Sequence, residues 1–173
     1  MIKMKHQLGV MDLYPISANK TPMENNPFFQ VKLKESVNPE RLHTAVKQSL
    51  GEHPLFACTL RYKKGYYLET NEKEFLLIRA AEENRPLAFG DATNGFLWQM
   101  CYDEYTISFE WCHAISDGKG AFAFFSSVLC HYFDVDCSVE PALELGLESL
   151  YNKAEQGIPQ KKQAKGFAAN ALP

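Results

Sequence analysis

The chain has 173 residues, of which 46% are hydrophobic and 13% aromatic, and its formal net charge at pH 7 is −3. This length and apolar content suffice for one buried core and exclude an intrinsically disordered chain. The negative balance excludes the usual electrostatic basis of nucleic-acid binding, a clustered excess of Lys and Arg, but leaves room for a small anionic ligand in a locally positive pocket.

The five cysteines include no Cys-x-x-Cys pair. Because an odd number without such spacing does not fit a disulfide framework, we expect a reducing compartment. The basic first six residues are not followed by an apolar run as long as that of a signal peptide. The longest apolar stretch, Gly120 to Phe133, is too short to cross a bilayer. We therefore expect a cytoplasmic protein without a membrane span.

The first predicted elements are a strand and a helix. Turn-forming residues 19 to 27 separate an apolar segment, Leu8 to Ile16, from Phe28 to Leu33, where alternating apolar residues predict a strand. Asn38 is placed to cap a helix that has Pro39 in its first turn. The residues that share one side of this helix are Leu42, Ala45, Val46, Ser49 and Leu50.

The middle of the chain is predicted to be β structure. Gly51 and Pro54 are expected to end the helix. Residues 82 to 95 form a loop rich in Glu, Asn, Pro and Gly, between the third and fourth of the strands that follow. The predicted strands, which include two hairpin pairs, are Phe56 to Tyr62, Tyr66 to Thr70, Phe75 to Arg79, Phe96 to Tyr102 and Tyr105 to Trp111.

The last part of the chain contains an apolar helix and a tail. Residues 119 to 133 are apolar nearly all round, which predicts a helix buried on every side. Pro141 to Ala154 is a second helix candidate, and residues 156 to 173, rich in Lys, Gln, Ala and Gly, are typical of a linker or extended arm. We expect one domain over residues 1 to 155 and a linker-like tail over residues 156 to 173.

A predicted strand, a tight turn and the apolar helix meet at His113-Ala114-Ile115-Ser116-Asp117-Gly118. A histidine at a strand end projects from a rigid scaffold, where a neutral imidazole can accept a proton from a hydroxyl or an amine. Gly118 permits backbone geometry closed to other residues, which predicts a constrained turn. On these local features alone, a hydrogen-bonded core histidine is the commoner interpretation.

Two other kinds of chemistry are not supported at this junction. Cys112 and His113 are adjacent on a strand, so their side chains point to opposite faces and are poorly placed as a nucleophile and base pair. A metal site on His113 and Asp117 needs a further ligand, and the other histidines show no ligand spacing. We expect neither thiol nor metal catalysis.

The junction resembles the HxxxDG motif of the chloramphenicol acetyltransferase-like acyltransferases, a superfamily that includes condensation domains of peptide synthetases and bacterial alcohol acetyltransferases. Residues 39 to 56 are similar to the first helix of the family and its His-Pro turn, and residues 60 to 69 resemble a hairpin of the alcohol acetyltransferase branch. The resemblance spans about residues 8 to 135. The residues that match the motif are His113, Asp117 and Gly118.

The resemblance implies an α/β fold, an α+β two-layer sandwich in which a mixed, largely antiparallel sheet has helices packed on one face. It implies that His113 is the general base that activates an alcohol or amine acceptor for attack on acyl-CoA, with acetyl-CoA as cosubstrate, no acyl-enzyme and no tightly bound cofactor. Asp117 is implied to be structural and to pair with an arginine. Ala57 occupies the position of that arginine in many members, and Arg61 is the predicted substitute.

Family members with the motif this early in the chain consist of two similar halves, with the active site between them. The second half carries a motif of the Asp-Phe-Gly-Trp type, which is not found in this sequence. We therefore expect either a missing C-terminal half or a homo-oligomer like the trimer of single-half chloramphenicol acetyltransferases. The alternative function is a non-catalytic module of the same fold that binds a partner or an acyl carrier.

Overall fold

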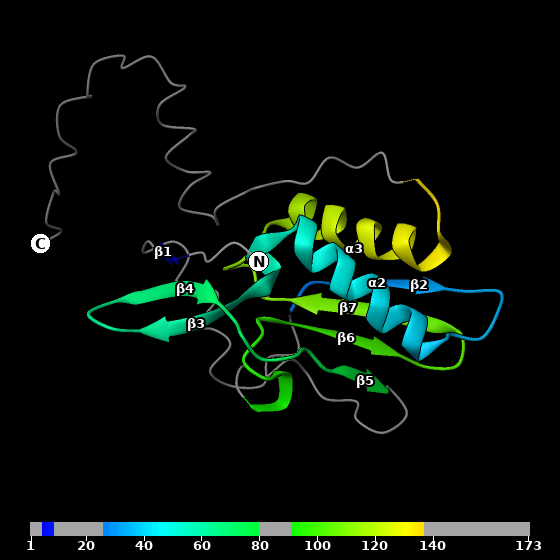
Figure 1. Cartoon of the computed structure of the whole chain (residues 1–173), viewed down its shortest axis with the longest axis horizontal. Coiled ribbons are helices and arrows are strands. Elements are labelled where there is room, and N and C mark those ends of the chain that lie inside the picture. The colour runs from blue at the N-terminus through cyan, green and yellow to red at the C-terminus, as the bar shows by residue number, and fades with distance from the viewer. Residues whose placement is uncertain (1–4, 9–25, 80–90, 137–173) are drawn as a thin grey trace, which may run out of the picture.

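In the computed structural model, which describes residues 5–8, 26–79 and 91–136, two helices cover one face of a four-stranded sheet (Figure 1). The helices are α2 (Pro39–Glu52) and α3 (Gly118–Phe133). The sheet has the order β2-β7-β6-β5, and only its β5–β6 pair is parallel among the described strands. Its strands are β2 (Phe28–Lys32), β5 (Leu77–Arg79), β6 (Trp98–Tyr102) and β7 (Thr106–Trp111).

A second, antiparallel sheet of order β1-β4-β3 extends from one end of the first. It consists of β1 (Lys5–Gln7), β3 (Cys58–Tyr62) and β4 (Tyr66–Thr70). The expected α/β sandwich, with a mixed and largely antiparallel sheet and helices on one face, is confirmed. Most of the apolar segment after Leu8, the helix candidate at Pro141 to Ala154 and the tail of residues 156 to 173 lie outside the described residues, as does the expected domain end at residue 155.

Helix α2 follows its sequence pattern closely. The Asn38 side chain accepts a hydrogen bond from the Arg41 N–H at 3.0 Å, and Pro39 occupies the first turn. The helix continues to Glu52, with His53 at the C-cap, so Gly51 lies inside its last turn. The expected face is confirmed, since its buried residues are Leu42, Ala45, Val46 and Ser49.

The hairpin that follows begins later than its apolar residues indicate. Residues Pro54–Ala57 form a 3-10 helix, η1, and β3 starts at Cys58. The strand was expected to start at Phe56, two residues too early. An apolar run does not by itself distinguish a strand from a buried helical turn. At the hairpin turn Gly65 has a φ of 143°, a backbone conformation that favours glycine over residues with a side chain.

The core between the layers is built from aromatic rings. Phe124 of α3 stacks on Phe56 at 4.2 Å and meets Phe109 at 5.3 Å and Trp98 at 5.7 Å. The Trp98 indole donates to the Phe56 carbonyl at 2.6 Å, which satisfies its buried N–H. These rings fix α3, and with it the turn that precedes the helix, against β6 and β7.

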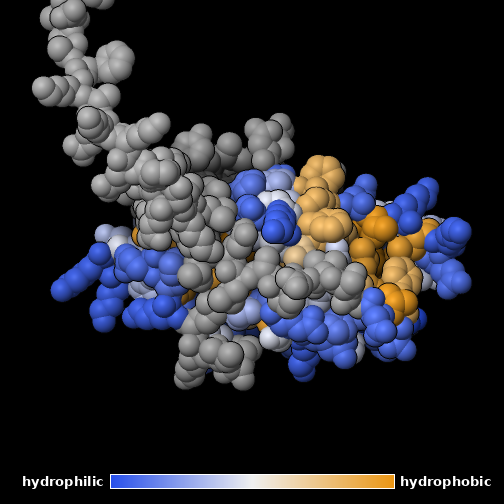
Figure 2. Space-filling model, turned by 90° about the horizontal axis from the view of Figure 1, so that it is seen from above, coloured by the Kyte–Doolittle hydropathy of each residue, from blue (hydrophilic) through white to orange (hydrophobic). Residues whose placement is uncertain are grey.

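The expectation that α3 is buried on every side is wrong. Phe122 and Phe133 are 55% and 47% exposed, and Leu129 is only partly buried. A helix in a two-layer fold touches the sheet below and one neighbouring helix, here α2, so its third side has no partner among the described residues. Figure 2, a view from above, shows apolar side chains gathered on this upper surface.

Candidate functional site

The motif occupies the connection between β7 and α3. The Cys112 N–H donates to the Leu97 carbonyl at 2.8 Å and so continues the ladder one residue past Trp111, the end of β7. The Ile115 N–H then donates back to the Cys112 carbonyl at 3.1 Å, which closes a turn. Helix α3 begins at Gly118, so the motif spans the turn and the first residue of the helix.

The turn is packed so that His113 alone of its central residues faces outward. Ala114, Ile115 and Ser116 are buried, whereas His113 is partly exposed. The Trp111 indole donates to the Ser116 carbonyl at 3.1 Å and ties the strand end to the far side of the turn. Both anchors are buried, so the backbone that carries His113 is held rigidly.

The His113 ring is oriented by Trp111, which it meets edge to face at 6.1 Å between centroids. Its Nδ1 atom is buried and has no hydrogen-bond partner among the described residues. An unpartnered buried ring nitrogen is unfavourable, and a catalytic role is one of the explanations for such an atom in a native structure. The ring is therefore fixed by packing and has one nitrogen shielded from solvent.

Asp117 is the N-cap of α3. Its side chain accepts a hydrogen bond from the Gly120 N–H at 2.8 Å, and the residue is partly exposed. The suggested pairing with Arg61 needs correction, because the Arg61 Nε donates to Glu69 at 2.7 Å. These two residues lie on neighbouring strands of the β1-β4-β3 sheet, where a cross-strand ion pair forms locally.

The constrained glycine of the turn is Gly120 rather than Gly118. Gly118 is exposed, its φ lies outside the left-handed region, and a Cβ on it would meet nothing within 4 Å among the described residues. A Cβ on Gly120 would lie 2.2 Å from the Ser116 hydroxyl oxygen. The motif spacing could not reveal this, because the close contact depends on how the first turn of α3 folds over Ser116.

A matched pair of substitutions tests this assignment. In Gly120→Ala the Ser116 hydroxyl must rotate away and lose its bond to the Asp117 carbonyl, so we expect a loss of about 1–3 kcal/mol in unfolding free energy. Gly118→Ala should be neutral or stabilising by up to about 1 kcal/mol, because the unfolded chain loses freedom. Urea unfolding of both variants measures the difference, and equal stabilities contradict the assignment.

The described cysteines with a shifted pKa, Cys58 and Cys101, are not activated thiols. Burial raises the pKa of Cys58 to about 11, and burial with help from the Glu110 charge raises that of Cys101 to about 11. Cys112 is fully buried and its sulfur lies 3.5 Å from the Ala114 backbone N–H. Thiols held in the protonated form react slowly, so Cys58 and Cys101 are not activated as nucleophiles.

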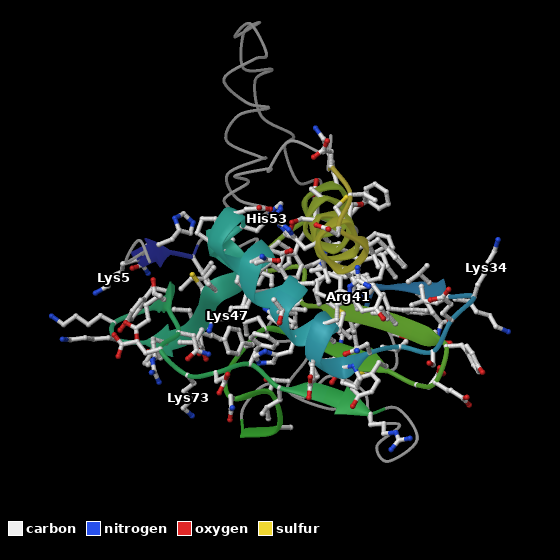
Figure 3. All side chains as sticks on the ribbon, turned by 45° about the vertical axis from the view of Figure 1, so that its right-hand side comes forward. Lys5, Lys34, Arg41, Lys47, His53 and Lys73 are labelled. Carbon is white, nitrogen blue, oxygen red and sulfur yellow. The ribbon has the colours of Figure 1, made fainter. Side chains whose placement is uncertain are left out.

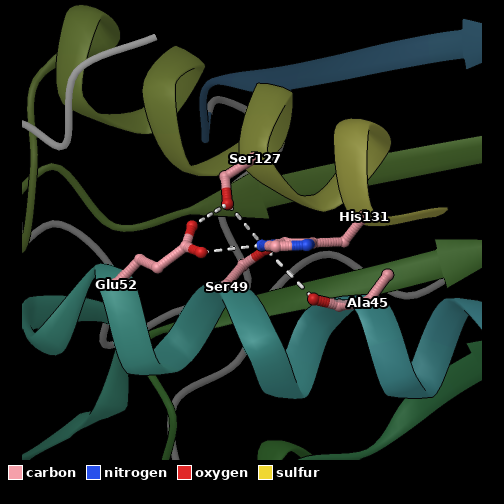
Figure 4. A network of polar contacts seen from close by, with 5 residues as sticks. All are labelled: Ala45, Ser49, Glu52, Ser127 and His131. Atoms are coloured by element: carbon pink, nitrogen blue, oxygen red, sulfur yellow. Dashed lines mark hydrogen bonds and ion pairs between the residues drawn. The ribbon is translucent and has the colours of Figure 1, made fainter. Parts of the chain in front are cut away.

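A second polar cluster, not anticipated from the sequence, joins α2 to α3 (Figure 4). The Ser127 hydroxyl lies 2.7 Å from a Glu52 oxygen and 2.9 Å from the Ser49 hydroxyl. His131 Nε2 lies 2.9 Å from the other Glu52 oxygen. No Ser–His contact is part of this arrangement among the described residues, so it is an interhelical clamp and not a nucleophile and base pair.

The clamp and its neighbour His53 shift two pKa values downward. Burial alone would raise the pKa of Glu52, but hydrogen bonds from Ser127 and His131 outweigh it and lower the pKa. Burial lowers the pKa of His53, and the Glu52 charge opposes this only in part. His53 lies at the C-terminal end of α2, whereas Arg41 lies near the N-terminal end (Figure 3). The Nδ1 atom of His53 has no hydrogen-bond partner among the described residues.

These shifts predict an acid-sensitive fold. A histidine whose pKa is depressed on folding stabilises the native state above its unfolded pKa of about 6.5, and this contribution is lost as the pH falls below that value. The urea midpoint should therefore decrease as the pH is lowered from 7 to 5. The depressed pKa of Glu52 acts in the same direction, but only below its unfolded value of 4.5. In His53→Gln the decrease in the urea midpoint should be smaller, because Gln does not titrate. Parallel profiles for the two proteins contradict the role of His53.

Within the described ranges, no three His, Cys, Asp or Glu side chains gather as a metal site. None of the described helices has the length and apolarity needed to cross a membrane.

No protein-family profile matches this chain, and no curated protein matches it in sequence. Solved structures do match. The starter condensation domain of rhizomide synthetase superposes with a TM-score of 0.61 at 14% identity, over 90% of this chain and 44% of that one. The condensation domain of the monacolin K polyketide synthase superposes with a TM-score of 0.59 at 13% identity, over 88% of this chain and 39% of that one. The X-domain from teicoplanin biosynthesis superposes with a TM-score of 0.59 at 14% identity, over 87% of this chain and 38% of that one.

At these identities the likeness shows the fold. The chain has the fold of these condensation domains, which is the fold that the HxxxDG resemblance implied. It spans about two fifths of the length of these three chains.

Proposed function

We propose that this chain supplies the general-base half of an acyltransferase site, in which His113 activates an alcohol or amine acceptor for attack on an acyl-CoA thioester. The observation that carries the proposal is the placement of His113. Its ring is partly exposed at a rigid strand-to-helix turn, and its Nδ1 is buried. The nitrogen left to meet a substrate is therefore Nε2.

The proposed reaction is a direct transfer. His113 Nε2 accepts the proton of the acceptor hydroxyl or amine as its oxygen or nitrogen attacks the thioester carbonyl carbon. The tetrahedral intermediate collapses, the carbon–sulfur bond breaks, and the departing thiolate of CoA takes the proton back from the imidazolium. No acyl-enzyme forms, and the protein ends each cycle in its starting protonation state.

Neighbouring groups support this role for His113 by holding the turn. Asp117 caps α3 and Trp111 bonds to the turn carbonyl of Ser116, so neither needs to touch the substrate. Since the chain spans about two fifths of its structural neighbours, we propose that the opposite wall of the site comes from a second half or from another subunit.

The second candidate is a non-catalytic binding module of the same fold, which the same partial coverage favours. An assay of CoA release from acetyl-CoA, with a panel of alcohols and amines, separates the two. Acceptor-dependent release supports the transferase, with acetyl-pantetheine as a donor arm that distinguishes free CoA from a carrier thioester. Saturable acetyl-CoA binding in calorimetry without release with any acceptor supports the binding module and contradicts catalysis by this chain.

A further inference from the structure

Strand β2 is at an edge of the four-stranded sheet as the described residues form it. It pairs with β7 on one side only among the described strands. The Trp111 N–H donates to the Pro27 carbonyl, and the Leu33 N–H donates to the Tyr105 carbonyl. Because bonding alternates along an antiparallel pair, Phe29 and Val31 also bond toward β7.

The backbone groups of the residues between them therefore point away from the sheet. Phe28, Gln30 and Lys32 each present an N–H and a C=O to the open edge, and no described residue receives them. Exposed strand edges of this kind are templates for pairing with another strand. Here the edge carries no proline or bulge within β2, and its Phe28 side chain is 65% exposed.

We propose that two copies of this chain pair through β2 in an antiparallel, two-fold arrangement centred on Gln30. In this register Gln30 lies opposite Gln30 of the second copy, and Phe28 lies opposite its Lys32. All the outward N–H and C=O groups of the three edge residues then bond across the axis. The two sheets become one continuous sheet, as expected for an isologous interface.

The side chains fit this register on the outer face of the sheet. Phe28 and Lys32 are exposed and lie at opposite ends of β2, so the two-fold axis places an ammonium group beside an aromatic ring twice. An antiparallel pairing shifted by two residues would set Lys32 opposite Gln30 instead. The pairing of Phe28 with Lys32 is therefore a property of the register centred on Gln30.

The helix face of the sheet fits equally well. Phe122 of α3 lies 5.8 Å from Phe29 of β2, between ring centroids, and is 55% exposed. The two-fold axis places Phe29 opposite Val31 of the second copy. In each copy, Val31, Leu33 and Phe133 help to line a groove of about 1190 Å³. Each Phe122 thus approaches the groove of the other copy, and both partly exposed ends of the α3 apolar face are covered.

The first test is the mass in solution by sedimentation over a concentration series. The wild-type chain of 19.7 kDa should sediment as a dimer of twice that mass. Gln30→Pro deletes an outward N–H without removing a backbone bond to β7, and should give a folded monomer; the side-chain bond from Gln30 to Ser108 is lost in Gln30→Ala as well. Gln30→Ala keeps the backbone N–H and should remain a dimer. Phe122→Glu places a charge in the interface and should be a monomer. A monomeric wild type, or a Gln30→Pro dimer, overturns the proposal.

A cysteine pair tests the register itself and does not depend on the proline variant folding. In Gln30→Cys the two thiols lie opposite each other, with Cα atoms about 5.5 Å apart, a distance that a disulfide accepts. We expect a covalent dimer on mild oxidation, absent from wild type. Lys32→Cys, which faces Phe28 of the second copy, should give none. No covalent dimer from Gln30→Cys overturns the proposal, whatever other segment or protein covers the edge. The inference does not rest on the proposed acyl transfer.

Discussion

Replacing His113 by alanine is expected to reduce acceptor-dependent CoA release by about 10²- to 10⁴-fold, which is the usual contribution of a general base. The variant removes the ring nitrogen that takes the acceptor proton. The change should be tolerated structurally because His113 is partly exposed and forms no hydrogen bond through Nδ1 among the described residues. The measurement is the initial rate of thiol release from acetyl-CoA at a saturating acceptor concentration.

The matched control is His43→Ala. His43 is also a partly exposed histidine, but it lies on α2, where it contacts Glu74 and stacks on Phe75. It should keep the wild-type rate. Equal rates for His113→Ala and the wild type contradict the base assignment, provided that both variants give the circular dichroism spectrum of the wild type.

The second large effect is on stability. Phe124→Ala should lower the free energy of unfolding by about 3–5 kcal/mol, the range for a fully buried phenylalanine whose loss leaves a cavity. Phe124 has no exposed surface and contacts rings from η1, β6 and β7. Because small domains have only about 5–15 kcal/mol in total, the variant should approach the unfolding threshold.

The control for Phe124→Ala is Leu76→Ala. Leu76 is 45% exposed, so its truncation should change the unfolding free energy by about 0.5 kcal/mol or less. Urea unfolding followed by circular dichroism measures both values. A Phe124→Ala loss no greater than that of Leu76→Ala would show that the aromatic cluster does not hold α3 on the sheet.

The fold could be predicted where a local signal determined it. Asn38 and Pro39 marked the start of α2 because capping depends on neighbouring residues. The start of β3 was misplaced by two residues, because Phe56 and Ala57 are buried in either conformation. The exposed face of α3 was missed because hydrophobicity alone does not show which sides of a helix receive a partner.

The site was predicted through its motif more than through its contacts. The sequence located the turn that carries His113, and the structure identifies Asp117 as the cap of α3. The partner of Arg61 was misjudged, because the position of an arginine in the sequence does not determine which neighbouring strand supplies a carboxylate, here Glu69 of β4. The Glu52–Ser127–His131 clamp left no local signal, since its members come together only when α2 and α3 pack.

The central claim is that His113 acts as the base, and chemical rescue tests it most directly. Added imidazole should restore acceptor-dependent CoA release to His113→Ala in proportion to the concentration of neutral imidazole, because a small base can enter the space left by the side chain. Imidazole should leave the rates of the wild type and His43→Ala unchanged. A His113→Ala protein that is already as fast as the wild type without imidazole would contradict the claim.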